Sequence, residues 1–327
     1  MKDYQNKKIL ITGGLGFIGS NLAIKLVDFG AFVTCVDSLI PEYGGNIFNI
    51  SPVKGKISIN ISDVRDKYSI EYLVKSNDMM FNLAGQTSHL DSMKNPINDL
   101  DINCRAQLII LEACKKYNNN IKIVFASTRQ IYGKPQYLPV DEVHPINPVD
   151  SNGINKVAGE SYHLLYNNIY GIKACALRLT NTYGPRMRIK DTRQTFLGIW
   201  IRNLIENKDI QIYGDGKQLR DLNYIDDVIN ALLIIGKSES AWGNVYNLGS
   251  KDVVELNTIA KVLIDLNKSG NINKIEFPDE IKSIDIGNYF SNFKKINKEF
   301  NWEPNISLKK GLSMTLDYYK EYFSYYI

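Results

Sequence analysis

The stretch "ILITGGLGFIGSNLAIKL", residues 9–26, constrains the fold of this chain more than any other. A β-branched run leads into Gly13, Gly16 and Gly19, and an amphipathic segment follows. Glycine at these positions lets the backbone turn tightly and approach an anionic group, while the first amides of a helix point towards its charge. The stretch therefore predicts a strand, a phosphate-binding turn and a helix, in that order.

An acidic residue follows at the spacing that a dinucleotide site requires. Asp37 ends the next β-branched run, "FVTCVD", 18 residues after Gly19. A carboxylate there accepts the hydroxyls of the adenosine ribose and repels a 2′-phosphate, and no Arg follows in "DSLIPE". NAD is therefore favoured over NADP. We expect Asp63 and Val64, in "ISDVRD", to cap the adenine with a carboxylate and a backbone amide.

Strand-like and helix-like segments alternate from Lys8 to about Asn181. The strand-like runs are "KILIT", "FVTCVD", "ISINISDV", "DMMFNLAG", "IKIVFAST" and "KACALRLT", and helices are expected over 19–30, 101–117 and 154–170. This alternation predicts an α/β fold with a Rossmann-type doubly wound parallel sheet. A smaller C-terminal substrate-binding lobe is expected to follow it. We expect residues 1–180 to form the NAD-binding domain, with a return over about 222–250, and residues 181–327 to form the interleaved substrate domain.

Composition excludes several other classes of protein. The 39 basic and 35 acidic residues are dispersed along the chain, so the net charge of +4 does not favour a nucleic-acid partner. The four cysteines form no CxxC pair, which favours reduced thiols and no metal site. The N-terminus lacks the pattern of a signal peptide and no run of 18 apolar residues occurs, so we expect a cytoplasmic protein without a membrane span.

Nine motifs follow one another along nearly the whole chain. They are "ITGGLGFIGS", "NLAGQTSHLDSMKNP", "DINCRAQLIILEAC", "FASTRQIYG", "NGINK", "LRLTNTYGPR", "IQIYGDGKQLRDLNYIDDV", "YNLGS" and "FNWEPNISLKKGL". In this order they resemble the extended short-chain dehydrogenase/reductases that modify nucleotide sugars, the NAD-dependent epimerase/dehydratase family. The stretches "LAGQ", "YNNNIKIVFAST" and "RQTFLGIWIRNLIE" are most similar to the branch that contains CDP-tyvelose 2-epimerase.

The resemblance implies a catalytic group of Ser or Thr, Tyr and Lys beside the nicotinamide. Thr128 and Lys156 match its first and last members, but the Tyr is replaced by Asn152 in "NGINK". A phenol with an ordinary pKa of about 10 can ionise beside a cation, whereas a carboxamide cannot. Loss of a positioned base typically costs about 10²- to 10⁴-fold in rate. The resemblance also implies cofactor contacts from Phe17, Ile18, Ser38, Leu83, Ala84, Gly85, Lys156 and Thr180.

Several groups are candidates for the missing proton transfer. Burial beside the cofactor would make Lys156 a base, although in relatives it binds the nicotinamide ribose. His89, on the loop after the fourth predicted strand, carries an imidazole, a side chain suited to proton transfer. Asp150 lies two residues before Asn152, and Tyr132 matches a position that is structural in relatives. Asn152 would then orient a sugar hydroxyl or a water, and a relay through Thr128 is a further alternative.

The substrate end departs from the dehydratase pattern. Arg129 and Gln130 follow Thr128 where sugar 4,6-dehydratases carry an Asp-Glu pair, so dehydration is disfavoured. Arginine forks suit a pyrophosphate. The substrate-binding set that the resemblance implies is His89, Thr128, Arg129, Gln130, Asn181, Arg186, Arg220 and Lys282. Residues 187–194 are expected to form a lid or a base-recognition loop.

The same resemblance implies a homodimer, in which helices over 101–117 and 154–170 pair across a four-helix bundle. Their apolar stripe, which is also consistent with an intramolecular core, includes Leu108, Leu111, Val157, Leu164 and Leu165.

The resemblance implies an NAD-dependent nucleotide-sugar epimerase that oxidises a carbinol to a ketone and reduces it again. Two alternatives stay open. One is a nucleotide-sugar 4-dehydrogenase or 4-ketoreductase. The other is a protein that binds NAD and a nucleotide sugar with little catalysis.

Overall fold

The computed structural model describes residues 2–327, and within them seven parallel strands form the central sheet. The strand order is β10-β6-β5-β4-β1-β2-β3, in which the direction of winding reverses between β1 and β4. The strands are β1 (Lys8–Thr12), β2 (Phe32–Asp37), β3 (Ser58–Ile61), β4 (Met79–Asn82), β5 (Lys122–Thr128), β6 (Ala174–Leu179) and β10 (Val245–Asn247). The doubly wound parallel sheet expected from the sequence is confirmed.

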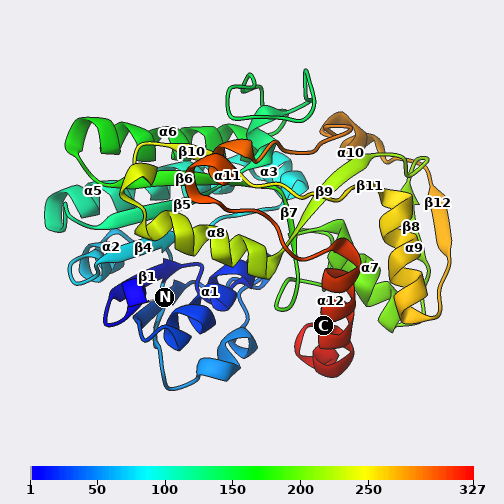
Figure 1. Cartoon of the computed structure of the whole chain (residues 1–327), viewed down its shortest axis with the longest axis horizontal. Coiled ribbons are helices and arrows are strands. Elements are labelled where there is room, and N and C mark those ends of the chain that lie inside the picture. Colours follow the sequence, from blue (N-terminus) through cyan, green and yellow to red (C-terminus); the bar gives the residue numbers. More distant parts are fainter. Residues whose placement is uncertain (1) are drawn as a thin grey trace.

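Helices cover both faces of this sheet because its strands are apolar on both sides. Ile9 and Ile11 of β1 pack into one core with α1 (Phe17–Asp28) and α8 (Ile225–Lys237). Leu10, between them, faces the second core, which is formed with α2 (Lys67–Val74), α5 (Ala106–Tyr117) and α6 (Ser151–Tyr170). Figure 1 shows these two helical layers above and below the strands.

The expected helix over 101–117 is divided in the structure. Residues Asp101–Arg105 form a π-helical turn, η4, that continues α4 (Pro96–Leu100) and leads into α5. The Gln107 side chain donates to the carbonyl of Ile102 at 3.0 Å. Asn103, inside this turn, donates to the buried carboxylate of Asp99 at 3.0 Å. The wide turn thus places polar side chains towards the carboxyl end of the sheet.

The second lobe lies beyond that end of the sheet, to the right in Figure 1. β9 (Leu219–Tyr224) pairs with β7 (Asn181–Tyr183) and β11 (Val253–Glu255), and β8 (Ile210–Tyr213) pairs with β12 (Ile272–Ile275). The other helices of this part are α7 (Phe196–Ile205), α9 (Leu256–Asn267), α10 (Asp279–Ser283) and α12 (Leu308–Tyr322), whereas α11 (Lys294–Phe300) packs beside β10 of the central sheet. The chain also returns from this part to the sheet, because α8 and β10 follow β9 in the sequence. A division at about residue 180 stays a prediction.

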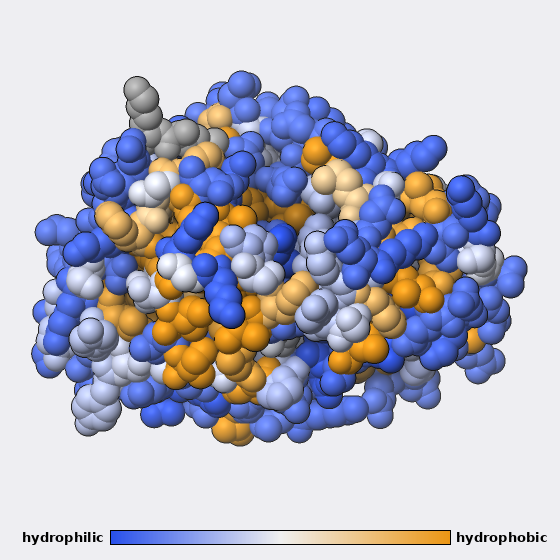
Figure 2. Space-filling view, turned by 90° about the horizontal axis from the view of Figure 1, so that it is seen from below, coloured by the Kyte–Doolittle hydropathy of each residue, from blue (hydrophilic) through white to orange (hydrophobic). Residues whose placement is uncertain are grey.

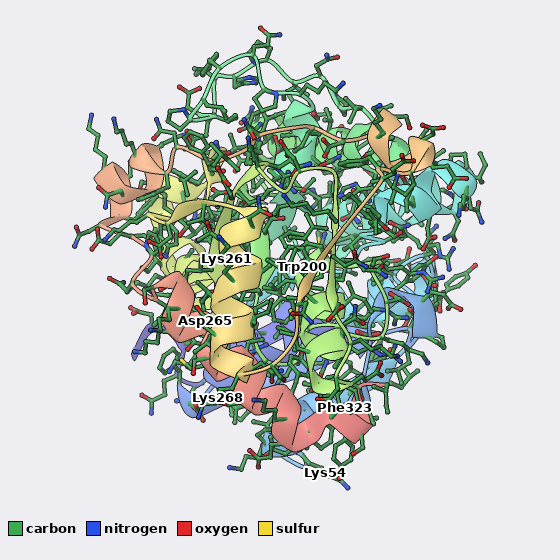
Figure 3. The ribbon with its side chains drawn as sticks, turned by 90° about the vertical axis from the view of Figure 1, so that its right-hand side faces the viewer. Lys54, Trp200, Lys261, Asp265, Lys268 and Phe323 are labelled. Carbon is green, nitrogen blue, oxygen red and sulfur yellow. The ribbon has the colours of Figure 1, made fainter. Side chains whose placement is uncertain are left out.

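Helix α9 illustrates how the lobe is packed. Ile259 and Leu263 are fully buried, whereas Lys261 and Asp265 are exposed on the opposite side. Figure 3 shows Trp200 of α7 beside this helix, with Lys261 and Asp265 labelled along α9. Seen from below, the molecular surface is mostly hydrophilic, with apolar side chains gathered near its middle (Figure 2). No helix within residues 2–327 combines the length and apolar character that a membrane span requires.

Candidate active site

A cleft opens at the carboxyl ends of β1 and β4, where the direction of winding reverses. It encloses about 780 Å³ of space between the atoms, including its open mouth. All of the predicted cofactor residues line it except Lys156 and Thr180. These lining residues are Gly13, Gly16, Phe17, Ile18, Gly19, Asp37, Ser38, Asp63, Val64, Leu83, Ala84 and Gly85.

The glycines of the turn carry no side chains, so the space beside the backbone stays free for a ligand. Gly13 has a φ of +67°, which favours glycine. A Cβ on Gly19 would lie 2.2 Å from the carbonyl oxygen of Gly13. The first turn of α1 therefore stands directly against the turn, with its free amides facing the cleft, as an anion-binding site requires.

The acidic residues of the cleft fit an adenosine with a free 2′-hydroxyl. The Asp37 carboxylate accepts backbone N–H groups from Leu15 at 3.0 Å and Leu39 at 2.9 Å. Burial raises the pKa of Asp37, and these hydrogen bonds oppose the rise. None of the described residues that line the cleft is basic, so none there would bind a 2′-phosphate. The residues fit NAD. Asp63 also lines the cleft, but Arg65 already holds both of its carboxylate oxygens, at 2.9 and 2.7 Å.

Lys156 lies immediately behind the cleft wall. Its Nζ donates to the carbonyl of Ala126 at 3.1 Å, and a Cβ on Gly85 would lie 3.1 Å from the same nitrogen. Burial lowers the pKa of Lys156 to about 8, and the charge of Asp99 opposes this. Thr128 ends β5 at the same edge of the sheet, and its hydroxyl accepts the backbone N–H of Gln130 at 3.2 Å.

Asn152 does not have the position expected for a residue that orients the substrate. Its side chain is buried, and its amide donates to the carbonyl of Gln86 at 2.8 Å and to Asp99 at 3.1 Å. Asn103 and Asn155 donate to the same carboxylate at 3.0 and 2.8 Å. Three amide side chains thus donate to the buried Asp99 carboxylate, so Asn152 belongs to a structural network beneath the site.

A cationic group lies at the substrate end. The Arg129 guanidinium donates to Asn181 at 3.2 Å and lies 5.0 Å from the centre of the Tyr289 ring. Its Nη1 is buried and has no acceptor within residues 2–327. Burial lowers the pKa of Arg129, and burial together with Arg129 lowers the pKa of Arg220 to about 10. Arg220 is paired with Asp285 at 3.6 Å, so it is the unpartnered nitrogen of Arg129 that favours an anionic ligand here.

Thr180 and Gln130 have structural hydrogen bonds of their own. The Thr180 hydroxyl donates to the buried Asp221 carboxylate at 2.6 Å, which aligns the ends of β6 and β9. The Gln130 amide donates to Asp150 at 2.8 Å. The phenol of Tyr132, another of the candidates for proton transfer, accepts a hydrogen bond from Arg178 at 2.6 Å and donates one to Asn247 at 2.7 Å. Its burial raises its pKa to about 12, which is consistent with a structural role.

The structure gives the surroundings of three other predicted substrate residues. The Arg186 guanidinium donates to the carbonyl of Asn49 at 3.1 Å and to Asn21 at 2.8 Å. Lys282 is exposed on α10, and the substrate contacts of both residues stay predictions. His89 begins helix α3 (His89–Lys94) and does not lie on a loop, because the Ser88 hydroxyl caps this helix by accepting the N–H of Asp91 at 3.2 Å.

The expected lid segment, residues 187–194, is attached to both sides of the cleft. The Arg188 guanidinium donates to the carbonyl of Pro41, and Arg193 donates to Asp91 at 2.7 Å. Gln194 lines the cleft itself. The cleft lining also includes residues that were not among the predicted site residues, namely Val36, Ile40, Tyr43, Ser62, Thr87 and Ile102. Their positions next to predicted site residues are the signal that was available for most of them.

Comparison with known proteins agrees with this geometry. The model of the family described as "NAD dependent epimerase/dehydratase family" matches residues 9–249. The chain is 35% identical to a putative UDP-glucose 4-epimerase of Methanocaldococcus jannaschii, over 95% of this chain and 98% of that protein. It is 29% identical to the CDP-paratose 2-epimerase of Salmonella typhi, over 95% of this chain and 98% of that protein.

The solved structures that are similar include UDP-glucose 4-epimerase from Thermotoga maritima with UDP-glucose. The TM-score is 0.87 at 27% identity, over 97% of this chain and 99% of that one. An epimerase from Methanothermobacter thermautotrophicus gives a TM-score of 0.92 at 25% identity, over 99% of this chain and 95% of that one. The chain therefore belongs to the NAD-dependent epimerase/dehydratase family, whose members use NAD.

Proposed function

We propose that this protein is an NAD-dependent nucleotide-sugar epimerase that oxidises a sugar carbinol transiently and reduces the ketone on its other face. The observation that carries this proposal is the order of groups along one edge of the sheet. The cofactor cleft, the Lys156 amine behind Gly85, Thr128 and the Arg129–Asn181 pair follow one another from β1 to β6. The epimerases named above, similar over nearly their full length, support the same reaction class.

The cofactor end is assigned to the residues that line the cleft. Gly13, Gly16 and Gly19 leave space for the pyrophosphate of NAD, and Asp37 accepts hydrogen bonds from the adenosine ribose. Bound there, NAD accepts a hydride in its oxidised form and donates one in its reduced form. Lys156 supplies a positive charge and N–H donors next to this end of the cleft.

The substrate end is assigned to Arg129, Asn181 and Arg220. Their charge and buried donors match the diphosphate of a nucleotide sugar. Thr128 lies between this group and the cofactor cleft, where its hydroxyl can donate to a sugar oxygen. Positions 129 and 130 carry a guanidinium and an amide, neither of which can act as the acid or base of a dehydration.

Conversion of nucleotide sugars tests the proposal. The purified protein with NAD would be incubated with UDP-, GDP-, CDP- and dTDP-sugars, and the ring protons followed by NMR. We expect inversion at one ring carbon of one of these substrates, with a deuterium on that carbon retained in the product. Accumulation of the reduced coenzyme with a ketone product would identify a one-way dehydrogenase instead. Absence of any conversion by protein that binds NAD would reject an enzymatic role.

We further propose that the protein is a homodimer through α6 and the neighbouring α5. Ile154, Leu165 and Ile169 are 57%, 47% and 65% exposed and lie on one face of α6, since they are spaced by 11 and 4 residues. Leu111 is fully buried in the core of its own chain, so it does not contribute to this face. Light scattering during size-exclusion chromatography should give twice the chain mass, and Leu165→Glu with Ile169→Glu should give the monomer.

A further inference from the structure

An imidazole and a buried carboxylate meet where α3 packs on α6. Nδ1 of His89 lies 2.9 Å from Oδ2 of Asp150. The Asp150 side chain is 0% exposed, whereas the His89 side chain is 38% exposed. The N–H direction at Nδ1 is not aligned on an acceptor, so a small rotation of the ring is needed to turn this close contact into a hydrogen bond. Such bonds often tighten only when substrate binds.

Asp150 is fixed in place and ionised. One of its oxygens accepts the backbone N–H of Gly153 at 2.7 Å, which caps α6, and the other accepts the Gln130 amide at 2.8 Å. Burial raises the pKa of Asp150, but its contacts with His89, Gly153 and Gln130 lower it by more, so that it lies below the usual value. A helix cap needs only one of the two oxygens. The second oxygen is therefore available to orient His89 and to balance its positive charge.

The pair is connected to the reacting end of the site by a short path. Gln130, which holds Asp150, donates its own backbone N–H to the hydroxyl of Thr128. Asn152 lies on the first turn of α6, two residues after Asp150, and its backbone N–H donates to Ser92 on α3. The imidazole thus comes from the helix that packs against the position of the missing phenol. The contact with Asp150 uses Nδ1 and therefore leaves Nε2 for a ligand.

We propose that His89, oriented by Asp150, accepts and returns the hydroxyl proton in place of the absent tyrosine. The inference rests on the proposed epimerase function. As the sugar O–H bond breaks, its proton bonds to Nε2 of His89, while oxidised NAD bound in the cleft would supply the acceptor for the hydride from the same carbon. The carbinol becomes a ketone, and the return of the same proton and hydride restores a carbinol. Asp150 stays ionised throughout and is a positioning residue.

Lys156 is the competing base, since its amine is buried behind the cleft wall. It already donates to the carbonyl of Ala126, and its charge is next to the cofactor end of the cleft. We assign it to cofactor binding. If His89 is the base, a His89 variant should lose proton transfer and keep its affinity for the nucleotide sugar. If Lys156 is the base, a Lys156 variant should show that behaviour instead.

The test uses the full-length protein with NAD and the nucleotide sugar that it converts. His89→Gln retains a polar contact with Asp150 but cannot take up a proton, so turnover should fall by about 10²- to 10⁴-fold. The dissociation constant of the nucleotide sugar, measured by calorimetry, should change by less than about threefold. Asp150→Asn keeps the helix cap, because Asn caps as well as Asp, and should lower kcat without changing that constant.

Chemical rescue separates a base from a structural residue. His89→Ala should recover turnover when imidazole is added, whereas Ser88→Ala, which weakens the same helix by removing its cap, should keep its turnover and not respond to imidazole. Melting temperatures confirm that each variant is folded. Turnover of His89→Gln within threefold of the wild type, or no rescue of His89→Ala, would overturn the assignment. A wild type that binds NAD but converts no sugar would reject the proposed function, and the role of His89 with it.

Discussion

Asn152→Ala is expected to lower the free energy of unfolding clearly while it changes the turnover only modestly. The change removes one donor to the Asp99 carboxylate and one to the carbonyl of Gln86, both in a buried network. A hydrogen bond to a charged acceptor contributes about 1.5–3 kcal/mol to the free energy of unfolding, and one to a neutral acceptor contributes about 0.5–1.5 kcal/mol. Asn103 still donates to both acceptors, so the loss lies towards the lower end, about 2–3 kcal/mol.

Urea unfolding followed by circular dichroism measures this loss as a decrease in the midpoint on the order of 1 M. Asn155→Ala is the matched control, because it removes the 2.8 Å donor to the other oxygen of Asp99 from the same helix. Both variants should lose similar stability and keep turnover within about tenfold of the wild type, well short of the loss of a base. A turnover that falls 100-fold in Asn152→Ala with an unchanged urea midpoint would show that this side chain faces the substrate after all.

Four further predictions concern the two ends of the site. Gly19→Ala places a Cβ against the Gly13 carbonyl and should raise the NAD dissociation constant at least about tenfold by calorimetry, whereas Gly171→Ala, with a φ of +71° in open space, should leave it unchanged. Asp37→Asn should weaken NAD by about tenfold and reduce the preference over NADP, seen as the ratio of the two dissociation constants; an unchanged ratio would contradict the ribose contact. Arg129→Met should increase thermal stability slightly, because it removes a buried charge with an unpaired Nη1, yet raise the KM of the nucleotide sugar about 10- to 100-fold. Because the folded-state pKa of Lys156 is about 8 and the unfolded value is 10.5, the stability of the wild type should increase relative to Lys156→Met as pH rises through that interval, measured by urea midpoints; a flat difference would mean that the amine is not desolvated.

Much of the fold follows from local patterns in the sequence. Each of the six β-branched runs identified above forms a strand of the parallel sheet, because β-branched residues favour extended backbone and the helical segments between the runs carry the chain back to begin the next parallel strand. The strand β10 could not be predicted individually. Its three residues, "VYN", are too few to show a hydrophobic periodicity, and they form a strand because they pair with β6. The π-helical turn of η4 was missed for a similar reason, because it depends on where Asn103 and Gln107 find acceptors.

The cofactor end of the site was more predictable than the substrate end. Gly13, Gly19 and Asp37 act through backbone geometry and spacing, which are visible in one short segment. Asn152 was expected beside the substrate because its position was inferred from a motif, whereas its rotamer is decided by Asp99, more than 50 residues earlier in the chain. The hydrogen bonds of Arg186 could not be predicted for the same physical reason, since its acceptors lie on segments 137 and 165 residues away.

The late return of the chain to the central sheet has a consequence for biosynthesis. When the first six strands have left the ribosome, the face that contains Ile9 and Ile11 still lacks α8, and β6 still lacks its neighbour β10. A nascent chain of that length presents a bare apolar layer and an unprotected strand edge, the two features that attract chaperones and promote aggregation. Productive folding of the nucleotide-binding half must therefore wait until about three quarters of the polypeptide has been made, and a truncated gene ending near residue 180 should yield insoluble material.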